Sequence, residues 1–476
     1  MKRLLKVSAL LLLLAAPAFC WETIGDGIEY QAWTIDGPNN VFATRMDRTN
    51  PNASIAMTQA KDAYKGNQTV RSQMSDNDGR IFYDGTEWGK RYKPVAGVNG
   101  DFYLSGGKSR GIRINDGHLT VSMGHDDTIW GGFYWTAARQ ALQSASYIKN
   151  TTILLKYADN SVVDVTDVNA SAEDNAYTMY NAKYGLRSPS DSAATDMLVY
   201  LGKPNIIGAV TGIVRSITPG GNTVIPFDCC VITAKGNAAT EMRAKAKVGD
   251  TVTITSSAYS CTSNHTTRVN LPANTLAAIS GLETVLENGV VMPYDNFPAL
   301  HERHPRTAVG YNDRYIFFMV CDGRRTSSIG MTGREMGNFL KDVLGATNGI
   351  CLDGGGSSTM VTNGTVRNKP SDGSERAVAN ALIMYNIQPK DQSTALSPCQ
   401  RVTSNASSLS VRRGPGTHNP AINTVSSGTG GYVTNHSLGG IKNGSNYWWE
   451  VKFDGGLIGC ASLKAADFGT IIAAAK

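Results

Sequence analysis

Residues 352–361 read LDGGGSSTMV, a segment that joins one acid to three glycines and three hydroxyl side chains. Apolar residues stand on both sides of it, whereas a flexible linker is usually polar on both sides. Glycines at the end of a buried strand let backbone N–H groups approach an anion closely, and hydroxyl groups add hydrogen-bond donors. The pattern therefore favours a phosphate or sugar site over a tight structural turn. The residues expected to bind there are Gly354, Gly355, Gly356, Ser357 and Ser358.

Three further clusters combine charged and polar side chains at the end or the start of an apolar run. They are Asn99 and Asp101 in GVNGDFY, His304, Arg306 and Thr307 in HERHPRTAVGY, and Asp372, Arg376 and Asn380 in KPSDGSERAVANALIMY. Each cluster also has a plain structural interpretation. Asn-Gly-Asp is a common turn, Arg306 is a surface charge, and Arg376 pairs with Glu375 in solvent.

One strand–helix–strand unit positions two of the acids. RYIFFMVCDGR is a predicted strand, and MTGREMGNFLKDVLG is a predicted helix that starts with a capping box of Thr332 and Glu335 and ends at Gly345. NGICLDGGG is a second predicted strand. A right-handed crossover would make the two strands parallel. Asp322 and Asp353 would then lie at the same edge of the sheet.

The overall composition excludes some classes of protein. The chain has 476 residues, of which 41% are hydrophobic, and this length predicts about two to four domains. The net charge of +6 is spread thinly, and no Lys/Arg block follows residue 6. We therefore expect no nucleic-acid partner.

The first twenty residues, MKRLLKVSALLLLLAAPAFC, have the features of a secretory signal peptide. A basic start precedes a short apolar run, and small residues mark a cleavage site. The run is too short to span a membrane, and the rest of the chain contains no candidate span. A lipoprotein anchor at Cys20 is a weaker alternative, because Phe19 stands where a small residue is expected. The sequence predicts a bacterial protein that is secreted, periplasmic or associated with the cell envelope.

Cysteine usage fits an exported protein, since eight cysteines are present and some should be paired. Their spacing matches no zinc motif. The plausible pairs are Cys321 with Cys351, Cys229 or Cys230 with Cys261, and Cys399 with Cys460. The sequence alone leaves this connectivity open.

A change in composition marks the C-terminal part. Residues 389–402 are polar and read as a linker. Residues 403–464 resemble a bacterial SH3-like domain, because LSVRRGPG fits its opening and NYWWEVKFDGGLIG fits its close. Cys460 stands where the close usually has a tryptophan. The resemblance implies a small all-β barrel that binds cell-wall peptide or glycan.

Six ordered blocks resemble the phosphodiester glycosidase family: ISGLETVLENG, HPRTAVGY, VCDGR, GMTGREMGNFL, LDGGGSSTMV and PSDGSERAVANAL. The similarity runs from about residue 93 to 386 and includes GVNGDFY and GIRINDGHL. It implies a catalytic domain over residues 22–388, with residues 136–270 as a strand-rich lobe or an inserted subdomain. From the strand–helix–strand unit we expect an α/β (α+β) fold with a mixed sheet.

The resemblance implies hydrolysis of a sugar-1-phosphate diester, and the residue types suit this chemistry. Arg306 can fork to phosphate oxygens, and a carboxylate must stand near an oxocarbenium-like anomeric carbon. The candidate acids are Asp353, Asp322 and Asp101, with Asp353 favoured because its glycines leave it accessible. The remaining predicted substrate-binding residues are Asn99, His304, Thr307, Arg324 and Arg376. We expect no required cofactor; a Ca²⁺ site formed by the three acids is an alternative use of these residues.

The predicted function is an exported hydrolase that removes an N-acetylglucosamine-like sugar from a sugar-1-phosphate diester in an envelope or extracellular glycopolymer. One alternative is a non-catalytic protein that binds cell wall or sugar phosphates. Another is a glycoside hydrolase of neutral glycans. Which acid acts as nucleophile, and whether the reaction retains or inverts configuration, stays open.

Overall fold

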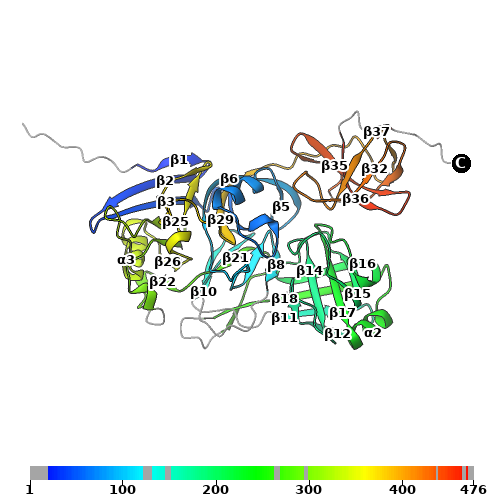
Figure 1. The fold of residues 1–476 in the computed structure, drawn as a ribbon, viewed down its shortest axis with the longest axis horizontal. Helices are drawn as coiled ribbons and strands as arrows, with labels where there is room; N and C mark the ends of the chain where they lie inside the picture. Colours follow the sequence, from blue (N-terminus) through cyan, green and yellow to red (C-terminus); the bar gives the residue numbers. More distant parts are fainter. Residues whose placement is uncertain are drawn as a thin grey trace, which may run out of the picture.

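The computed structural model describes residues 20–121, 131–144, 152–261, 268–293, 298–435, 438–463 and 468–469. The predicted signal peptide lies outside these residues, apart from Cys20. Within the described part, no helix is both long and apolar enough to cross a membrane. Figure 1 shows the sheets near the N-terminus in blue, a green lobe beside them and a C-terminal part in orange and red.

The first sheet has eight strands in the order β1-β2-β3-β25-β24-β26-β22-β23, and every neighbouring pair is antiparallel. Its strands are β1 (Glu22–Gly25), β2 (Ile28–Ile35), β3 (Asn39–Asp47), β22 (Thr284–Glu287), β23 (Val290–Val291), β24 (Arg306–Tyr311), β25 (Tyr315–Cys321) and β26 (Asn348–Cys351).

A second sheet, of six strands, has the order β28-β27-β6-β29-β4, with β5 beside β6. Its strands are β4 (Ala53–Gln59), β5 (Ile81–Tyr83), β6 (Trp88–Asn99), β27 (Met360–Thr362), β28 (Thr365–Val366) and β29 (Asn380–Gln388). Helix α1 (Val70–Asn77) packs on β6 and β29.

The third sheet has five strands, in the order β10-β9-β21-β7-β8. They are β7 (Arg113–Asn115), β8 (His118–Val121), β9 (Gly132–Thr136), β10 (Ala141–Ser144) and β21 (Thr275–Ser280). Strand β21 pairs with both β9 and β7, so the chain leaves this sheet after β10 and returns to it at β21.

The intervening strands form a separate sheet, which we call the lobe (residues 152–257). Its order is β12-β11-β18-β16-β15-β17-β14-β13. The elements are β11 (Thr152–Lys156), β12 (Val162–Val165), β13 (Asp167–Val168), β14 (Tyr177–Asn181), β15 (Ser190–Tyr200), β16 (Gly208–Gly221), β17 (Cys229–Lys235), α2 (Gly236–Lys245) and β18 (Thr251–Ser257). A two-stranded ribbon, β19 (Tyr259–Cys261) with β20 (Arg268–Asn270), leads back to the third sheet.

The C-terminal strands form a sheet of their own, which we call the C-terminal module (residues 401–463). Its path runs β32-β31-β36-β35-β33-β30-β37, with β34 beside β35. The strands are β30 (Arg401–Ser404), β31 (Leu409–Arg412), β32 (Ala421–Val425), β33 (Gly430–Val433), β34 (Ile441–Asn443), β35 (Asn446–Phe453), β36 (Ile458–Leu463) and β37 (Phe468–Gly469). The SH3-like assignment and the domain boundaries stay predictions.

The predicted mixed α/β sheet is wrong, because strands make up 49% of the structure and helices only 9%. Tight turns explain the difference. Two-residue turns in which both residues have positive φ join antiparallel neighbours, and parallel strands need a longer crossover. Such turns are Asp116-Gly117 between β7 and β8, Asn288-Gly289 between β22 and β23, and Asn363-Gly364 between β27 and β28.

The predicted strand–helix–strand unit is present in a modified form. Strands β25 and β26 are both antiparallel to β24, so they point in the same direction with β24 between them. Thr332 and Glu335 form the predicted capping box at the start of α3 (Gly333–Asn338). A π-helical turn, η3 (Phe339–Val343), then continues the helix, and Val343 is 48% exposed.

No cysteines in the described part lie at disulfide distance. Cys321 and Cys351 are buried free thiols on the two strands that flank β24. Strands separated by a third are roughly 9–10 Å apart, which exceeds the span of a disulfide. Cys399 and Cys460 are also free, as are Cys229 and Cys230. The side chain of Cys261 lies outside the described residues.

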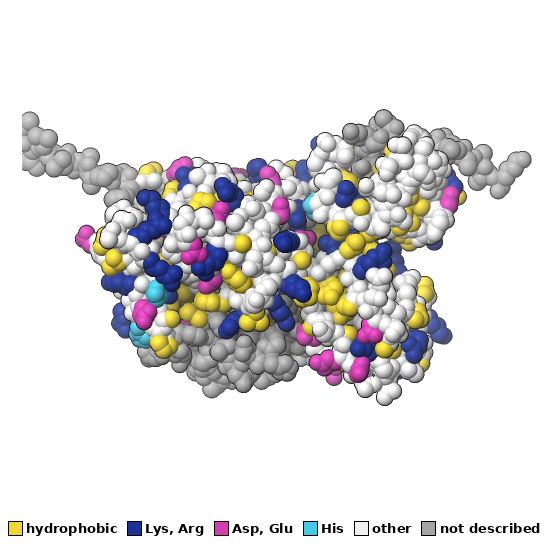
Figure 2. All heavy atoms as spheres, viewed as in Figure 1, with side chains coloured by type: hydrophobic (Ala, Val, Ile, Leu, Met, Phe, Trp, Pro, Cys, Tyr) yellow, Lys and Arg dark blue, Asp and Glu magenta, His cyan; other side chains and the backbone are white. Residues whose placement is uncertain are grey.

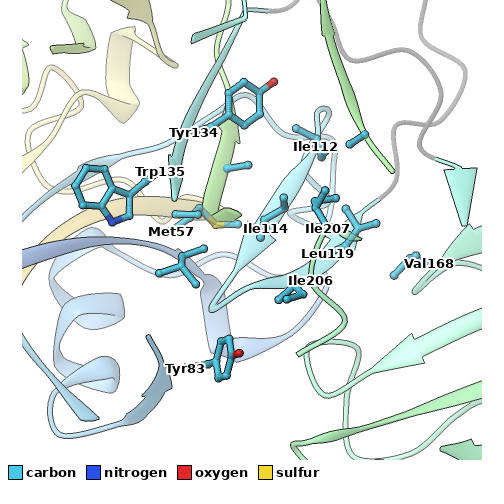
Figure 3. Close-up of a cluster of buried hydrophobic side chains, with 14 of the residues drawn as sticks. Met57, Tyr83, Ile112, Ile114, Leu119, Tyr134, Trp135, Val168, Ile206 and Ile207 are labelled. Atoms are coloured by element: carbon cyan, nitrogen blue, oxygen red, sulfur yellow. The ribbon is translucent and has the colours of Figure 1, made fainter. Parts of the chain in front are cut away.

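The largest apolar core is shared by several of these parts. Figure 3 shows Met57 of β4, Trp135 of β9 and Ile114 of β7 close to Ile206 and Ile207, which lead into β16 of the lobe. The same cluster includes Trp448 of the C-terminal module. The lobe and the module therefore pack against the sheets that carry the candidate site.

Candidate active site

Strand ends from the first two sheets meet at one place. The N–H of Asp353, just after β26, donates to the carbonyl of Gly100, just after β6 (3.0 Å). The N–H of Gly100 in turn donates to the carbonyl of Asn380, the first residue of β29 (3.0 Å). Segments that are more than 250 residues apart in the chain are thus joined through their backbones.

Asn99 holds these strand ends in position and is fully buried. Its side-chain nitrogen donates to the carbonyl of Asp353 (2.6 Å). Its side-chain oxygen accepts from the hydroxyl of Thr307 (2.7 Å) and from the N–H of Thr359 (3.1 Å). Because these bonds occupy both ends of the amide, Asn99 and Thr307 position the site rather than contact a substrate.

Asp101 is a buried acid with one unused oxygen. Its Oδ1 accepts from the hydroxyl of Ser109 (2.9 Å) and from the amide of Asn380. Its Oδ2 is buried and has no hydrogen-bond partner among the residues that the structure describes. Burial raises the pKa of Asp101 to about 7, and the charge of Asp353 adds to the rise, while Arg113 opposes it. Asp101 therefore keeps its proton below about pH 7 and loses it above that pH.

Asp353 is the less buried acid and lies close enough to Asp101 for their charges to interact. Its Oδ1 accepts from the N–H of Gly354 (2.8 Å). Burial raises the pKa of Asp353 to about 6, while bonds from Ser357 and Gly354 and the charge of Arg376 oppose the rise. We call Asp101 and Asp353 the acid pair. Near pH 6.5 one of these carboxyl groups is mainly protonated and the other mainly ionised.

Arg113 of β7 lies behind the acid pair and has no exposed surface. Its Nη2 donates to the carbonyl of Tyr64 (2.8 Å), and its Nη1 is buried without a partner. Burial lowers the pKa of Arg113 to about 10, and the charge of Asp101 opposes this fall. A buried cation thus balances the acid pair without forming a close ion pair with Asp101.

Two arginines and a tyrosine surround the glycine segment. The guanidinium of Arg324 lies over Gly355, since an added Cβ there would be 3.1 Å from its Nη2. Arg324 is exposed, and no ion pair is recorded for it among the described residues. Arg376 pairs with Asp372 (2.7 Å) and lies 3.5 Å from the hydroxyl of Ser357. These cations can bind an anionic group beside the acid pair.

Tyr103 faces the same place. Burial raises the pKa of Tyr103, and the charges of Asp353 and Arg376 act on it in opposite directions. Its hydroxyl donates to the carbonyl of Ala377 (3.3 Å). Tyr103 therefore lies within electrostatic range of both an acid and a cation of the site.

Three predicted site residues are held in other interactions. Arg306 donates to the carbonyls of Met331, Ala299 and Glu302, at 2.9, 2.7 and 2.7 Å. Asp322 accepts from the N–H of Lys369 (2.9 Å) and from the side chain of Asn368 (3.2 Å). His304 contacts Glu302 (3.0 Å) through Nε2. The guanidinium of Arg306 thus supports loops. Its donors at Nε and Nη2 are used in these bonds and are not left for the predicted two-point contact with a phosphate.

The glycine amides form less of an anion nest than the sequence predicts. The N–H of Gly354 bonds to Asp353, and the N–H of Gly355 bonds to the carbonyl of Pro305 (2.9 Å). The glycines instead allow close approach: an added Cβ at Gly356 would overlap the ion pair of Arg376 with Asp372. Ser357 and Ser358 are buried, and the hydroxyl of Ser358 has no hydrogen-bond partner.

Three residues that shape the site were not selected from the sequence: Tyr103, Ser109 and Arg113. All lie in or near the segments GVNGDFY and GIRINDGHL, which the family resemblance had singled out. Ser109 had no signal of its own, because its role depends on the fold of residues 101–113. Arg113 could have been selected from the sequence, because it is an arginine inside an apolar strand.

The three acids predicted as a Ca²⁺ site do not gather. The Asp322 carboxylate is bonded to residues 368–369. Within the described ranges there is no group of three or more His, Cys, Asp or Glu side chains that could hold a metal ion. The residues present therefore do not form the oxygen-rich cage that Ca²⁺ prefers.

Comparison with known proteins bears on this arrangement. Residues 204–385 match the family model described as phosphodiester glycosidase. An uncharacterized SPbeta prophage-derived protein, YomE, from Bacillus subtilis (strain 168) is 41% identical over 87 residues, which is 18% of this chain and 13% of that protein. The N-acetylglucosamine-1-phosphodiester alpha-N-acetylglucosaminidase of Mus musculus is 44% identical over 70 residues, which is 14% of this chain and 13% of that enzyme. The alignments thus span about an eighth of each relative's length.

A solved structure shares the fold over a longer stretch. The crystal structure of a hypothetical protein from Synechocystis matches with a TM-score of 0.53 and 15% identity, over 78% of this chain and 64% of that chain. The family match contains Asp353, Arg324 and Arg376, whereas Asp101 and Arg113 precede it. The similarity to the phosphodiester glycosidase family is therefore found in residues 204–385.

Proposed function

We propose that this protein is a hydrolase that removes a sugar from a sugar-1-phosphate diester and leaves a phosphomonoester. The observation that carries the proposal is the acid pair beside two arginines. The charges of Asp101 and Asp353 interact, and Arg324 has no recorded acidic partner in the part of the chain that the structure describes. Carboxylates serve the anomeric carbon of a glycoside, and guanidinium groups serve a phosphate.

The difference in burial supports a different role for each acid. Asp353 is the less buried of the two, so it is the acid that faces the anomeric carbon. In its ionised form it stabilises the positive charge that develops as the C1–O bond breaks. The electron pair of that bond goes to the phosphate oxygen. Water supplies the new oxygen on C1, and the proton that this water loses ends on the phosphomonoester that is formed. Asp101 holds a proton behind Asp353 and acts as a positioning residue.

The phosphate needs binding more than protonation, because a phosphomonoester is already a good leaving group. Arg324 and Arg376 would hold its negative charge, which grows in the transition state. Tyr103 and Ser357 lie close enough to Arg376 to orient the same group. This replaces the predicted role of Arg306.

The sugar and the location are proposed on other grounds. The name of the mouse relative, which is similar over 70 residues, supports an N-acetylglucosamine-like sugar. The leader-like residues 1–20 support export, and the SH3-like sequence of residues 403–464 supports attachment to cell-wall peptide or glycan. An envelope or extracellular glycopolymer with sugar-1-phosphate linkages fits these features.

The test uses the mature chain with an N-acetylglucosamine-1-phosphate methyl diester and follows the release of reducing sugar. Wild type should release sugar and Asp353→Asn should not, whereas Arg324→Gln should release it with a higher KM. A neutral aryl N-acetylglucosaminide is the control substrate. If Arg324→Gln loses the same share of its activity on both substrates, the result would favour a neutral-glycan hydrolase. Binding of the diester without sugar release would favour the non-catalytic binder.

A further inference from the structure

A large cleft lies between the lobe and the loops next to the acid pair. Neither the acid pair nor the arginines beside it line this cleft. Its volume is about 550 Å³. One wall consists of Tyr64, Lys65, Ser105 and Lys108, and the lobe supplies the other wall. Pockets for single small ligands measure about 300–1,000 Å³, so this cleft has room for one sugar-phosphate unit of a longer chain.

The charge of the cleft is positive. Lys65 and Lys108 are exposed, and neither has an ion pair among the described residues. The lobe wall contributes one acid, Asp191, and its carboxylate is already paired with Lys235 at 3.0 Å. Two cations of the cleft are therefore left without a counter-charge, and both lie on the wall nearest the acid pair.

Two aromatic rings join the walls. Tyr64 and Tyr184, one from each wall, are stacked with their ring centroids 4.8 Å apart and an angle of 19° between the rings. Tyr180 supports Tyr184 edge-on, with the centroids 4.7 Å apart. The stack holds the two walls at a set distance, and the cleft is thus preformed. Because the stacked ring faces cover each other, the tyrosines offer their ring edges and hydroxyl groups to a sugar in the cleft.

The cleft and the acid pair share one loop. Residues 104–108 form a tight turn in which the N–H of Leu104 donates to the carbonyl of Lys108 (2.8 Å). Ser109, the next residue, donates to Asp101. On the same wall the carbonyl of Tyr64 accepts from Arg113. The groups that hold the acid pair from behind are thus neighbours of the groups that line the cleft.

We infer that this cleft binds the part of an anionic glycan chain that extends beyond the cleaved linkage, so that the substrate is an oligomer or polymer of sugars carrying further phosphate groups. The inference rests on the proposed function and deepens it by naming the substrate class. Lys65 and Lys108 would bind a phosphate next to the cleaved one, and the tyrosines would contact the sugar between them. The lobe then serves as the second wall of a substrate cleft.

The experiment compares a short and a long substrate on the mature chain. The short one is the N-acetylglucosamine-1-phosphate methyl diester, and the long one is a synthetic trimer of N-acetylglucosamine units joined by 1-phosphodiesters. The test variant is the double substitution Lys65→Gln with Lys108→Gln. Lys341→Gln, at an exposed lysine of η3, is the matched control.

We expect the double variant to raise KM for the trimer about five- to tenfold at low salt, since each exposed ion pair contributes little. The kcat for the trimer and both constants for the methyl diester should stay unchanged, as should all constants of the control. Added salt should remove the difference, because it screens exposed charges. Equal changes on both substrates, or no change on the trimer, would overturn the inference.

A binding measurement separates this inference from the proposed function. Calorimetric titration of the Asp353→Asn variant with the trimer, with and without the two lysine substitutions, needs no turnover. Binding that depends on the lysines, together with a wild type that hydrolyses neither substrate, would refute the proposed function and keep the anionic-glycan cleft. Hydrolysis of the methyl diester by the wild type, with trimer binding unaffected by the lysine substitutions, would keep the proposed function and refute the anionic-glycan cleft.

Discussion

The substitution Asp101→Asn tests the electrostatics of the site. Asparagine retains the oxygen that accepts from Ser109 and Asn380, but it cannot ionise. In the native protein burial raises the pKa of Asp101 to about 7 from the ordinary value of 3.8. The folded wild type therefore keeps a proton that the unfolded chain releases.

The sign and size of the effect follow from proton linkage. Because the folded-state pKa is raised, the contribution of Asp101 to stability is fully present below pH 3.8 and is lost as the pH rises through 7. The linkage relation gives a loss of about 2.5 kcal/mol between pH 5 and pH 8. Asp101→Asn should lack this loss, so its free energy of unfolding should fall less over that range.

The assay is urea denaturation of wild type and variant at pH 5, 6, 7 and 8. Asp342→Asn, at an exposed acid of η3, serves as the control and should follow the wild type. If Asp101→Asn and wild type lose the same free energy between pH 5 and pH 8, then Asp101 ionises normally. In that case the argument that burial keeps it protonated is refuted.

Three further predictions concern activity on the phosphodiester. The rate should peak near pH 6.5, because it rises as Asp353 ionises and falls as Asp101 loses its proton. A pH–rate profile should give apparent pKa values of about 6 and 7. A flat profile from pH 5 to 8 would contradict this. Arg324→Gln should raise KM about tenfold for the diester and leave a neutral glycoside unaffected, since one charge-assisted contact is lost; equal KM values for the diester in variant and wild type would exclude the phosphate contact. Gly356→Ala should reduce kcat at least about tenfold, because its Cβ would displace Arg376 from the site. Alanine at the exposed Gly364 is the control for activity. Full activity of Gly356→Ala would show that the position of Arg376 is unimportant.

Local sequence patterns predicted several elements correctly. The capping box at Thr332 depends on residues three positions apart, and hydrophobic runs marked β25 and β26. Their common direction also followed from the strand–helix–strand order, and it places Asp322 and Asp353 at one edge. The family segments around Asp101 and Asp353, which the resemblance singled out, lie side by side in the structure.

Pairings between distant strands could not be read from the same patterns. Insertion of β24 between β25 and β26 made the sheet antiparallel and kept Cys321 and Cys351 from bonding. No local signal specifies which strand will lie between two others. The α/β expectation failed for this reason, although the helix on which it was based exists.

The sequence by itself determined which chemical groups are present: acids after strand ends, arginines near glycines, and a positive but dilute charge, which Figure 2 shows spread over one face of the molecule. Only the tertiary structure decided which of these groups are left for chemistry. Arg306 and Asp322 were predicted as catalytic residues, yet backbone carbonyls hold the first and an amide N–H holds the second. A hydrogen bond to the backbone depends on where distant chain segments lie, and that is a property of the folded chain.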